Sequence, residues 1–317
     1  MIRIRVVSPA DVTGQLISVI ASDPSVLNLA VVRGSVTNPD GDAVEFEVPQ
    51  GKANEVVELL RSFGAEDRGS ISLEEVATPA SRTAARVIKE RPRFDEFAPV
   101  WDLVDARIRA DGQFPPSWYM LLVIAGLIGV VGILTNSQIL IVGAMVVGPE
   151  YGAIVSLAFG VIRREPSRIS SSIYALGVGF SLAIIGAILL SLVVRSAGLT
   201  PTAFLLGVRP VSHLINTPDW FSVMVAVLAG VVGVISLTEA RASTLIGVFI
   251  SVTTIPAAAD IGVCLPYGLG KQALGSAEQL LLNVALLTVV AIAGIPAQRA
   301  VWRRVTGNNQ RSSKKTT

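Results

Sequence analysis

Residues 137–153 read SQILIVGAMVVGPEYGA, an apolar run typical of a membrane-spanning helix, except that it contains Gly148-Pro149 followed by Glu150. Pro149 has no backbone N–H donor and clashes with the preceding turn, so we expect the helix to kink or break there. A freed carbonyl and a carboxylate are costly at membrane depth unless they face protein or a water-filled cavity. We therefore predict that this break contributes to a functional site.

The composition indicates a membrane protein with a soluble N-terminal part. Of the 317 residues, 51% are hydrophobic and only 16% are charged, whereas about a quarter of the residues in soluble proteins are charged. Residues 1–115 read as soluble sequence and residues 118–297 mostly as membrane sequence. We expect no signal peptide, because the first residues lack its apolar core. The single cysteine, Cys264, excludes an intrachain disulfide and a cysteine-cluster metal site. The net charge of +2 gives no argument for nucleic acid as a partner.

Residues 1–76 predict a small cytoplasmic domain with a ferredoxin-like fold. The turn at residues 38–41, Asn-Pro-Asp-Gly, lies between two strand-like runs and favours a hairpin. The order of elements is βαββαβ, with strands expected at 2–7, 27–36, 43–48 and 70–76 and helices at 10–21 and 53–63. The fold hosts many functions, so it suggests regulation or assembly only by analogy.

Residues 77–117 predict a helical linker broken by Pro92 and Pro99. Five apolar residues spaced by three or four fall on one helix face: Phe94, Phe97, Trp101, Val104 and Ile108. This face either packs on the soluble domain or a neighbouring subunit, or lies in the membrane interface. Trp118-Tyr119 are then expected to form an aromatic belt at the membrane edge.

Six apolar segments follow, each near the ~20 residues that cross a bilayer, at 118–134, 139–162, 169–194, 220–237, 245–269 and 280–297. With six crossings, most loop arginines and lysines fall on one side, including Arg163-Arg164 and the basic tail of residues 299–317. The positive-inside rule makes that side cytoplasmic. We therefore predict a multi-pass protein of the cell inner (plasma) membrane with both termini in the cytoplasm.

The membrane part also shows an internal repeat. Gly129-Val130-Val131-Gly132 in the first segment recurs as Gly230-Val231-Val232-Gly233 in the fourth, and the break at Pro149 has a counterpart at Pro256. Three segments per half is an odd number, which predicts two inverted three-helix repeats whose broken helices form a site near the midplane. The alternative is a duplication that only builds a stable bundle.

Residues 136–154, NSQILIVGAMVVGPEYGAI, resemble the first signature of the bacterial and archaeal "uncharacterized hydrophobic domain" family, domain of unknown function 389. The stretch from Glu239-Ala240-Arg241-Ala242 through Gly247-Val248 to Pro256 and Gly262 is similar to its second signature. The resemblance covers about residues 120–300 and implies the membrane fold. Glu150 stands where the family usually has an apolar residue, and Pro256-Ala257 where it often has two prolines. The family's name implies nothing about a substrate.

The candidate ligand-binding residues gather at the two breaks. Glu150 follows the first break, and Asp260 lies four residues after Pro256 as its possible counterpart. Each carboxylate either binds an ion or polar solute or only holds helices together. The remaining candidates for a site are Gly148, Pro149, Pro256, Thr253, Thr254 and Asn283, and Glu239 with Arg241 form a gate, an ion pair or a solvated turn.

These residues together predict a transporter or channel for a small solute or ion, with the soluble domain regulating it or assembling a homo-oligomer. The alternative is a membrane-anchored sensor whose N-terminal domain binds a cytoplasmic metabolite. The expected partners are the solute or ion, the lipid bilayer and further copies of the chain. No phosphate-binding loop, catalytic triad or set of metal ligands is evident in the sequence, so we expect neither an enzyme nor a cofactor.

Overall fold

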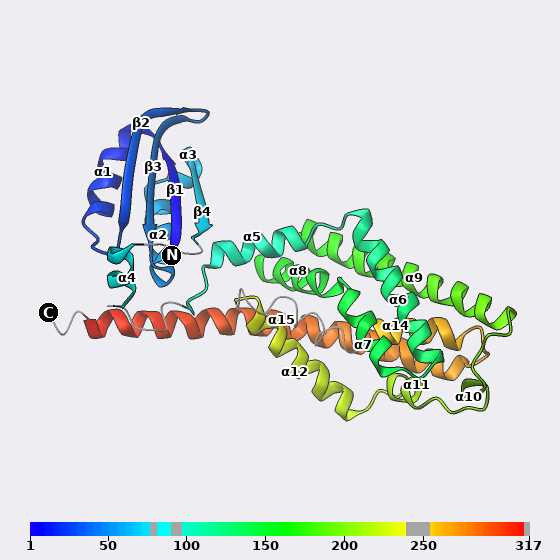
Figure 1. Ribbon diagram of the computed structural model, residues 1–317. Coiled ribbons are helices and arrows are strands. Elements are labelled where there is room, and N and C mark those ends of the chain that lie inside the picture. The colour runs from blue at the N-terminus through cyan, green and yellow to red at the C-terminus, as the bar shows by residue number, and fades with distance from the viewer. Residues whose placement is uncertain (77–80, 90–96, 239–253, 314–317) are drawn as a thin grey trace. The chain divides into compact units, whose positions relative to one another are not determined.

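The computed structural model describes residues 1–76, 81–89, 97–238 and 254–313 (Figure 1). It is mostly helical, with a small antiparallel sheet near the N-terminus. The chain forms two compact units, Met1–Asp105 with Arg299–Thr317, and Ala106–Gln298.

The first unit contains a four-stranded sheet in the order β2-β3-β1-β4, in which all neighbouring strands are antiparallel. Its elements are β1 (Ile2–Ser8), α1 (Ala10–Ala21), β2 (Leu27–Thr37), β3 (Asp40–Val48), α2 (Gln50–Ser62), α3 (Ala65–Arg68) and β4 (Ser70–Glu75). Alternate residues of β1 and β3 are buried, and in the register Ile4 lies opposite Phe46. They pack with Leu16 of α1 and Leu60 of α2, as period-2 strands beside amphipathic helices require. The predicted strands, helices and hairpin are confirmed, and the structure adds the one-turn helix α3.

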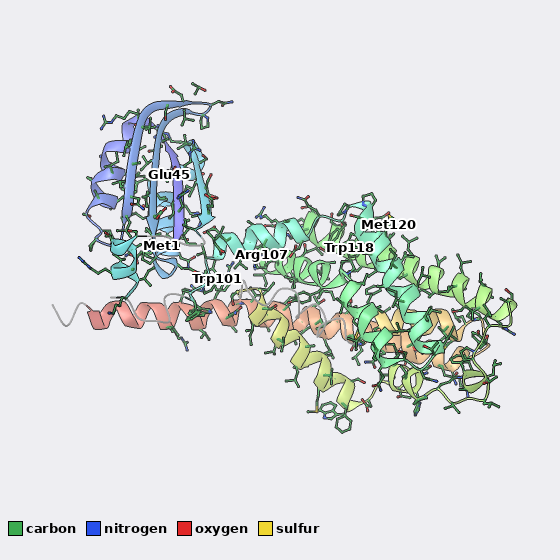
Figure 2. The ribbon with its side chains drawn as sticks, in the orientation of Figure 1. Met1, Glu45, Trp101, Arg107, Trp118 and Met120 are labelled. Carbon is green, nitrogen blue, oxygen red and sulfur yellow. The ribbon has the colours of Figure 1, made fainter. Side chains whose placement is uncertain are left out.

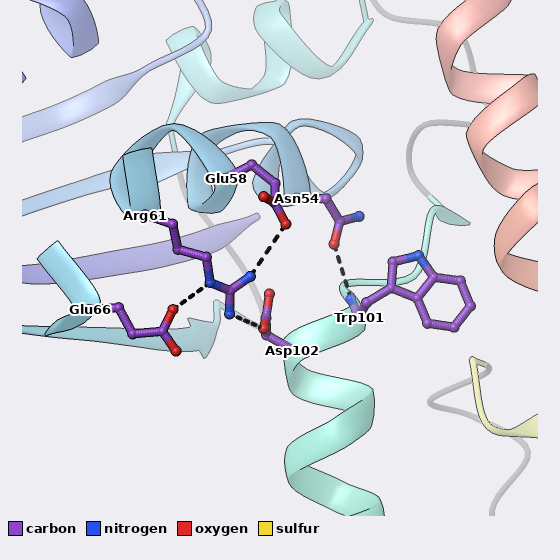
Figure 3. A network of polar contacts seen from close by, with 6 residues as sticks. All are labelled: Asn54, Glu58, Arg61, Glu66, Trp101 and Asp102. Carbon is purple, nitrogen blue, oxygen red and sulfur yellow. Dashed lines mark hydrogen bonds and ion pairs between the residues drawn. The ribbon is translucent and has the colours of Figure 1, made fainter. Parts of the chain in front are cut away.

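Two helices lie in the predicted linker, α4 (Arg82–Lys89) and α5 (Trp101–Asp111). The start of α5 is fixed to α2, because Asn54 Oδ1 accepts a hydrogen bond of 3.0 Å from the Trp101 backbone N–H (Figure 3). Arg61 adds an ion pair of 2.6 Å to Asp102. Of the predicted apolar face, Val104 and Ile108 are buried and Phe97 is exposed, while Phe94 lies outside the described residues.

The second unit is a helical bundle. Its elements are α6 (Pro116–Leu134), α7 (Gln138–Val147), α8 (Glu150–Arg163), α9 (Pro166–Ser196), α10 (Thr202–Leu205), α11 (Pro210–Ile215), α12 (Trp220–Ser236), α14 (Thr254–Cys264) and α15 (Gly270–Ser313), the last of which continues into the first unit.

Three described helices are long and apolar enough to cross a membrane, Pro116–Leu134, Pro166–Ser196 and Gly270–Val305, and α7 with α8 makes a fourth if the bent pair is one span. Helix α12 is shorter, although it matches the fourth predicted segment closely. The sixth predicted segment, 280–297, is part of a much longer helix, since Pro296 does not end α15.

The fifth predicted segment, 245–269, differs most from the structure. Residues 239–253 lie outside the described part, and α14 ends at Cys264, two residues before Pro266. Prolines commonly follow a helix end at this distance, because they cannot continue the helix. Every residue of α14 is buried, so this short helix lies in the interior of the bundle and has no lipid-facing stripe among its residues.

Small residues bring α14 close to its neighbours α6 and α9. A Cβ on Gly129 of α6 would lie 2.7 Å from Ala259 Cβ. A Cβ on Gly262 would overlap Ala187 Cβ of α9 and lie 3.0 Å from the backbone nitrogen of Ile188. Glycine is thus required at both positions, because the helix backbones are too close for a side chain.

Candidate functional site

The helix break predicted at Gly148-Pro149 is present. Helix α7 ends at Val147 and α8 begins at Glu150, and the two axes differ by 49°. Gly148 adopts an extended conformation with ψ of 123°. The Glu150 carboxylate and the Ile255 side chain fill the space beside Gly148, so the position has no room for a side chain.

The side chain of Trp118 closes the break from α6. Its indole Nε1–H donates a hydrogen bond of 3.2 Å to the carbonyl oxygen of Pro149. Trp118 is only 7% exposed, near the start of α6 (Figure 2), and it makes an edge-to-face contact with Phe114. The expectation that Trp118 belongs to an aromatic belt is therefore wrong, because its N–H satisfies a carbonyl that the break leaves without a helical partner.

The start of α8 meets α14 at this break. Glu150 is the first residue of α8, Thr254 is the first described residue of α14, and both are buried. The Thr254 hydroxyl donates a hydrogen bond of 2.6 Å to Glu150 Oε1. The free N–H groups and the dipole of a helix N-terminus favour negative charge. The geometry therefore places an acidic side chain at the start of α8, in contact with α14.

The second predicted break is only partly described. Pro256 is the third described residue of α14 and is buried. Thr253, Glu239 and Arg241 lie outside the described residues.

Asp260 lies at a separate place in the interior, six residues after Thr254 on α14, which corresponds to a rise of about 9 Å. It is fully buried. Ser212 of α11 donates a hydrogen bond of 2.7 Å to Asp260 Oδ1, and Ser276 of α15 donates one of 2.6 Å to Oδ2. Cys264 Sγ lies 3.5 Å from Oδ2. Donors from α11, from α15 and from α14 itself thus surround one carboxylate.

Helix α15 carries buried polar side chains on one face at Ser276, Gln279 and Asn283. The Gln279 Nε2 donates a hydrogen bond of 3.3 Å to Asn283 Oδ1. Asn283 was a predicted site residue, whereas Ser212, Ser276 and Gln279 were not. The signal on α15 was available in the sequence as polar residues three and four apart in an apolar helix. Ser212 lies on the six-residue helix α11, which is too short to show such a pattern.

The end of α5 covers α8 near the break. A Cβ on Gly152 would lie 3.3 Å from Asp111 Cβ, and Gly112 approaches the Ser156 side chain. Burial against α8 raises the pKa of Asp111, and the nearby Arg107 opposes this shift. The described residues contain no cluster of three or more His, Cys, Asp or Glu that fits a metal ion.

Comparison with known proteins gives a family match for part of the chain but no activity. The chain is 22% identical over 173 residues to an uncharacterized protein of Methanocaldococcus jannaschii, an alignment that covers 55% of this chain and 51% of that protein. The match thus spans about half the length of the curated relative. No solved structure matches the chain. Residues 145–289 match the model of the family described as "Domain of unknown function (DUF389)", so the family resemblance expected from the sequence is confirmed for this part of the chain.

Proposed function

We propose that the protein is a membrane transporter or channel for a small solute or ion, with its site where the start of α8 meets α14. One observation carries this proposal, the buried hydrogen bond of 2.6 Å between Thr254 and Glu150. It joins residues 104 positions apart, Glu150 at the start of α8 and Thr254 on α14. Transporter sites near the membrane midplane are built from helix starts such as that of α8, because they offer unpaired backbone donors and fixed partial charges.

The free-energy cost of burying the Glu150 carboxylate supports a functional role for it. Ionisable side chains inside a membrane bundle are expensive and are usually kept for ion or substrate pathways. Broken helices are tolerated there when they are buried in protein or line a cavity. Glu150 combines both features, since it is buried and directly follows the break.

We propose two inverted three-helix repeats with six crossings, and similar helix packing in the two halves supports the repeat. In the first half, a Cβ on Gly126 of α6 would lie 3.2 Å from the Ala183 carbonyl oxygen of α9. In the second half, a Cβ on Gly230 of α12 would lie 2.8 Å from Val290 Cγ1 of α15. The first and third helices of each half thus pack through glycines. We place both termini in the cytoplasm, with the chain in the inner (plasma) membrane, on the distribution of arginines and lysines.

For the N-terminal domain we infer a ferredoxin-like fold with a regulatory or assembly role. The sheet has the strand order β2-β3-β1-β4 with antiparallel neighbours, which is the arrangement of a ferredoxin-like βαββαβ fold. The edge strands β2 and β4 have one free side each within the sheet. An edge of this kind can pair with another copy of the domain, which supports a homo-oligomer.

Reconstitution of the Glu150→Gln variant tests the proposal. The variant keeps an oxygen that can accept from Thr254 but removes the charge. Purified protein is first screened for thermal stabilisation by salts and small metabolites, since a ligand at 100 times its Kd stabilises by about 2.7 kcal/mol. Ligands that stabilise are then followed into proteoliposomes, where we expect flux in the wild type and at least a tenfold loss in the variant.

The matched control is Glu278→Gln, an exposed carboxylate on α15, and we expect wild-type flux from it. A metabolite that stabilises wild type and Glu150→Gln equally, with no flux in either, contradicts the transporter and favours the sensor. Equal flux in wild type and Glu150→Gln would show that transport does not need the charge of Glu150.

A further inference from the structure

The carboxylate of Asp260 has no cationic partner in the described part of the chain, where it takes part in no ion pair with a lysine, arginine or histidine. All of its hydrogen bonds come from neutral groups, the Ser212 and Ser276 hydroxyls, the Cys264 thiol and the Asn216 side-chain amide. The charge of Arg209 acts on the neighbouring Cys264 thiol, but its guanidinium lies on the Phe204 ring, 4.3 Å from the centroid, and donates to the Phe204 carbonyl oxygen. A buried carboxylate without a compensating charge is strongly unfavourable, so the site needs positive charge from elsewhere.

A second buried acceptor lies on α15, one turn from the Ser276 that bonds this carboxylate, and its oxygen is unsatisfied among the described residues. Gln279 is one turn along α15 from Ser276, on the same face, and is only 4% exposed. Its Nε2 donates to Asn283, but its Oε1 has no hydrogen-bond partner among the described residues. Buried side-chain acceptors are almost always paired. The orphan oxygen is thus an independent sign that something positive belongs here.

We propose that Asp260, Ser212, Ser276 and Gln279 bind an alkali-metal cation that serves as the coupling ion of the transporter. The inference rests on the proposed function, because it assigns a role in that transport to a site distinct from Glu150. All four side chains offer oxygen atoms, the ligands preferred by hard cations.

The single carboxylate of the cluster favours a monovalent over a divalent cation. Divalent cations are usually held by more than one carboxylate, and the described residues bring a single carboxylate to this cluster. A proton on Asp260 would neutralise the carboxylate, but it would leave the Gln279 oxygen orphaned. An alkali cation satisfies both acceptors, and the serine hydroxyls can turn their lone pairs toward it.

Helix α11 closes this site from the loop between α9 and α12. Ser212 is supported by Asn216, whose Nδ2 donates a hydrogen bond of 3.2 Å to the Ser212 hydroxyl oxygen. The Asn216 carbonyl oxygen packs directly on Gly275, where a Cβ would overlap it. The bound cation therefore neutralises Asp260 and stabilises the contact of α11 with α15. Release of the cation leaves the buried carboxylate uncompensated and so weakens this contact.

Labelling of Cys264 in the full-length protein tests the site. Cys264 is the only cysteine, is fully buried, and lies beside Asp260. A thiol-reactive dye reaches it only when the interior opens, so its labelling rate falls by the factor 1 + [salt]/Kd if the cation binds the closed form. A Kd of about 10 mM predicts about tenfold slower labelling in ~100 mM NaCl or KCl than in N-methylglucamine chloride.

The variants are compared by the ratio of labelling rates without and with salt, because each substitution can also change the rate itself. We expect no salt protection in Asp260→Asn and weaker protection in Ser276→Ala and Gln279→Leu. Their controls are Ser181→Ala, an exposed serine on α9, and Glu278→Gln, an exposed carboxylate on α15, which should keep the wild-type ratio. Equilibrium binding of radioactive sodium or rubidium gives a second measurement, expected at one ion per chain, that does not depend on the variants folding.

Several results overturn the cation site. The first is equal salt protection of Cys264 from labelling in wild type and Asp260→Asn, and the second is protection by MgCl2 alone. The others are a labelling rate that responds to pH but not to NaCl or KCl, and the absence of a bound ion in the equilibrium measurement. If flux does not depend on alkali cations, the coupling role is wrong but the proposal of a transporter is unaffected. Salt protection and a bound ion in a protein that supports no flux overturn the transporter and leave the cation site standing.

Discussion

Replacement of Gly262 by alanine tests the central packing of the bundle, the approach of α14 to α9. An added Cβ would overlap Ala187 Cβ and lie 3.0 Å from both the Ala187 carbonyl carbon and the Ile188 nitrogen. Two of these three atoms belong to the backbone of α9, so they move only if the whole helix moves. We therefore expect Gly262→Ala to be destabilising.

The magnitude follows from two opposing effects. Overpacking a well-packed interior costs about 1–3 kcal/mol, and alanine is favoured over glycine inside a helix by about 1 kcal/mol. Because the added Cβ would overlap Ala187 Cβ, the upper part of the overpacking range applies, and the net loss is on the order of 1–2 kcal/mol. At about 2–4 °C per kcal/mol, this corresponds to a decrease in Tm of roughly 2–8 °C.

Gly177→Ala on α9 is the matched control. Gly177 is exposed, and a Cβ there would have no neighbouring atom within 4 Å. Only the helix-propensity gain applies, so we expect this variant to be more stable by up to about 1 kcal/mol. The two substitutions are chemically identical and are expected to act in opposite directions.

The assay is thermal unfolding in detergent followed by a fluorogenic thiol-reactive dye. The buried Cys264 ends α14, the helix that Gly262→Ala perturbs, and reports its exposure without any engineered label. If Gly262→Ala unfolds at or above the wild-type temperature while Gly177→Ala shows its gain, α14 and α9 are not in backbone contact and the reasoning is refuted.

Two further predictions concern the break and the N-terminal domain. Trp118→Phe removes the donor to the Pro149 carbonyl and should lower the free energy of unfolding by about 1–3 kcal/mol. The control Trp220→Phe, at an exposed position, should change it by no more than about 0.5 kcal/mol. Equal effects of the two variants in the dye assay would contradict the role of the Trp118 N–H. The Gly34 backbone N–H, 2.7 Å from Asp42 Oδ1, holds the pKa of Asp42 below its usual value, with the Thr13 hydroxyl as the next cause. The ionised Asp42 therefore stabilises the domain above the unfolded pKa of about 3.9, and this contribution is lost as the pH falls through the lower folded pKa. Asp42→Asn should thus raise amide exchange in residues 27–48 at pH 7 relative to wild type, and a difference that persists unchanged below both pKa values would contradict this assignment.

Local patterns in the sequence determined most of the secondary structure. The strands and helices of residues 1–76 follow from alternation with period 2 or 3.6, which depends only on neighbouring residues. The break at Gly148-Pro149 follows from the covalent structure of proline. The family match of residues 145–289 and the apolar helices α6, α9 and α12 were likewise readable from the chain.

The tertiary structure decided which polar groups meet. Glu150 and Thr254 are 104 residues apart, and Asp260 and Ser212 are 48 apart. No local periodicity encodes such pairs, because they depend on how close glycines such as Gly262 allow the helices to pack. The interior position of Trp118 and of the short helix α14 has the same origin. An indole N–H or a predominantly apolar helix suits the membrane surface and the bundle interior equally well, and only long-range packing selects between them.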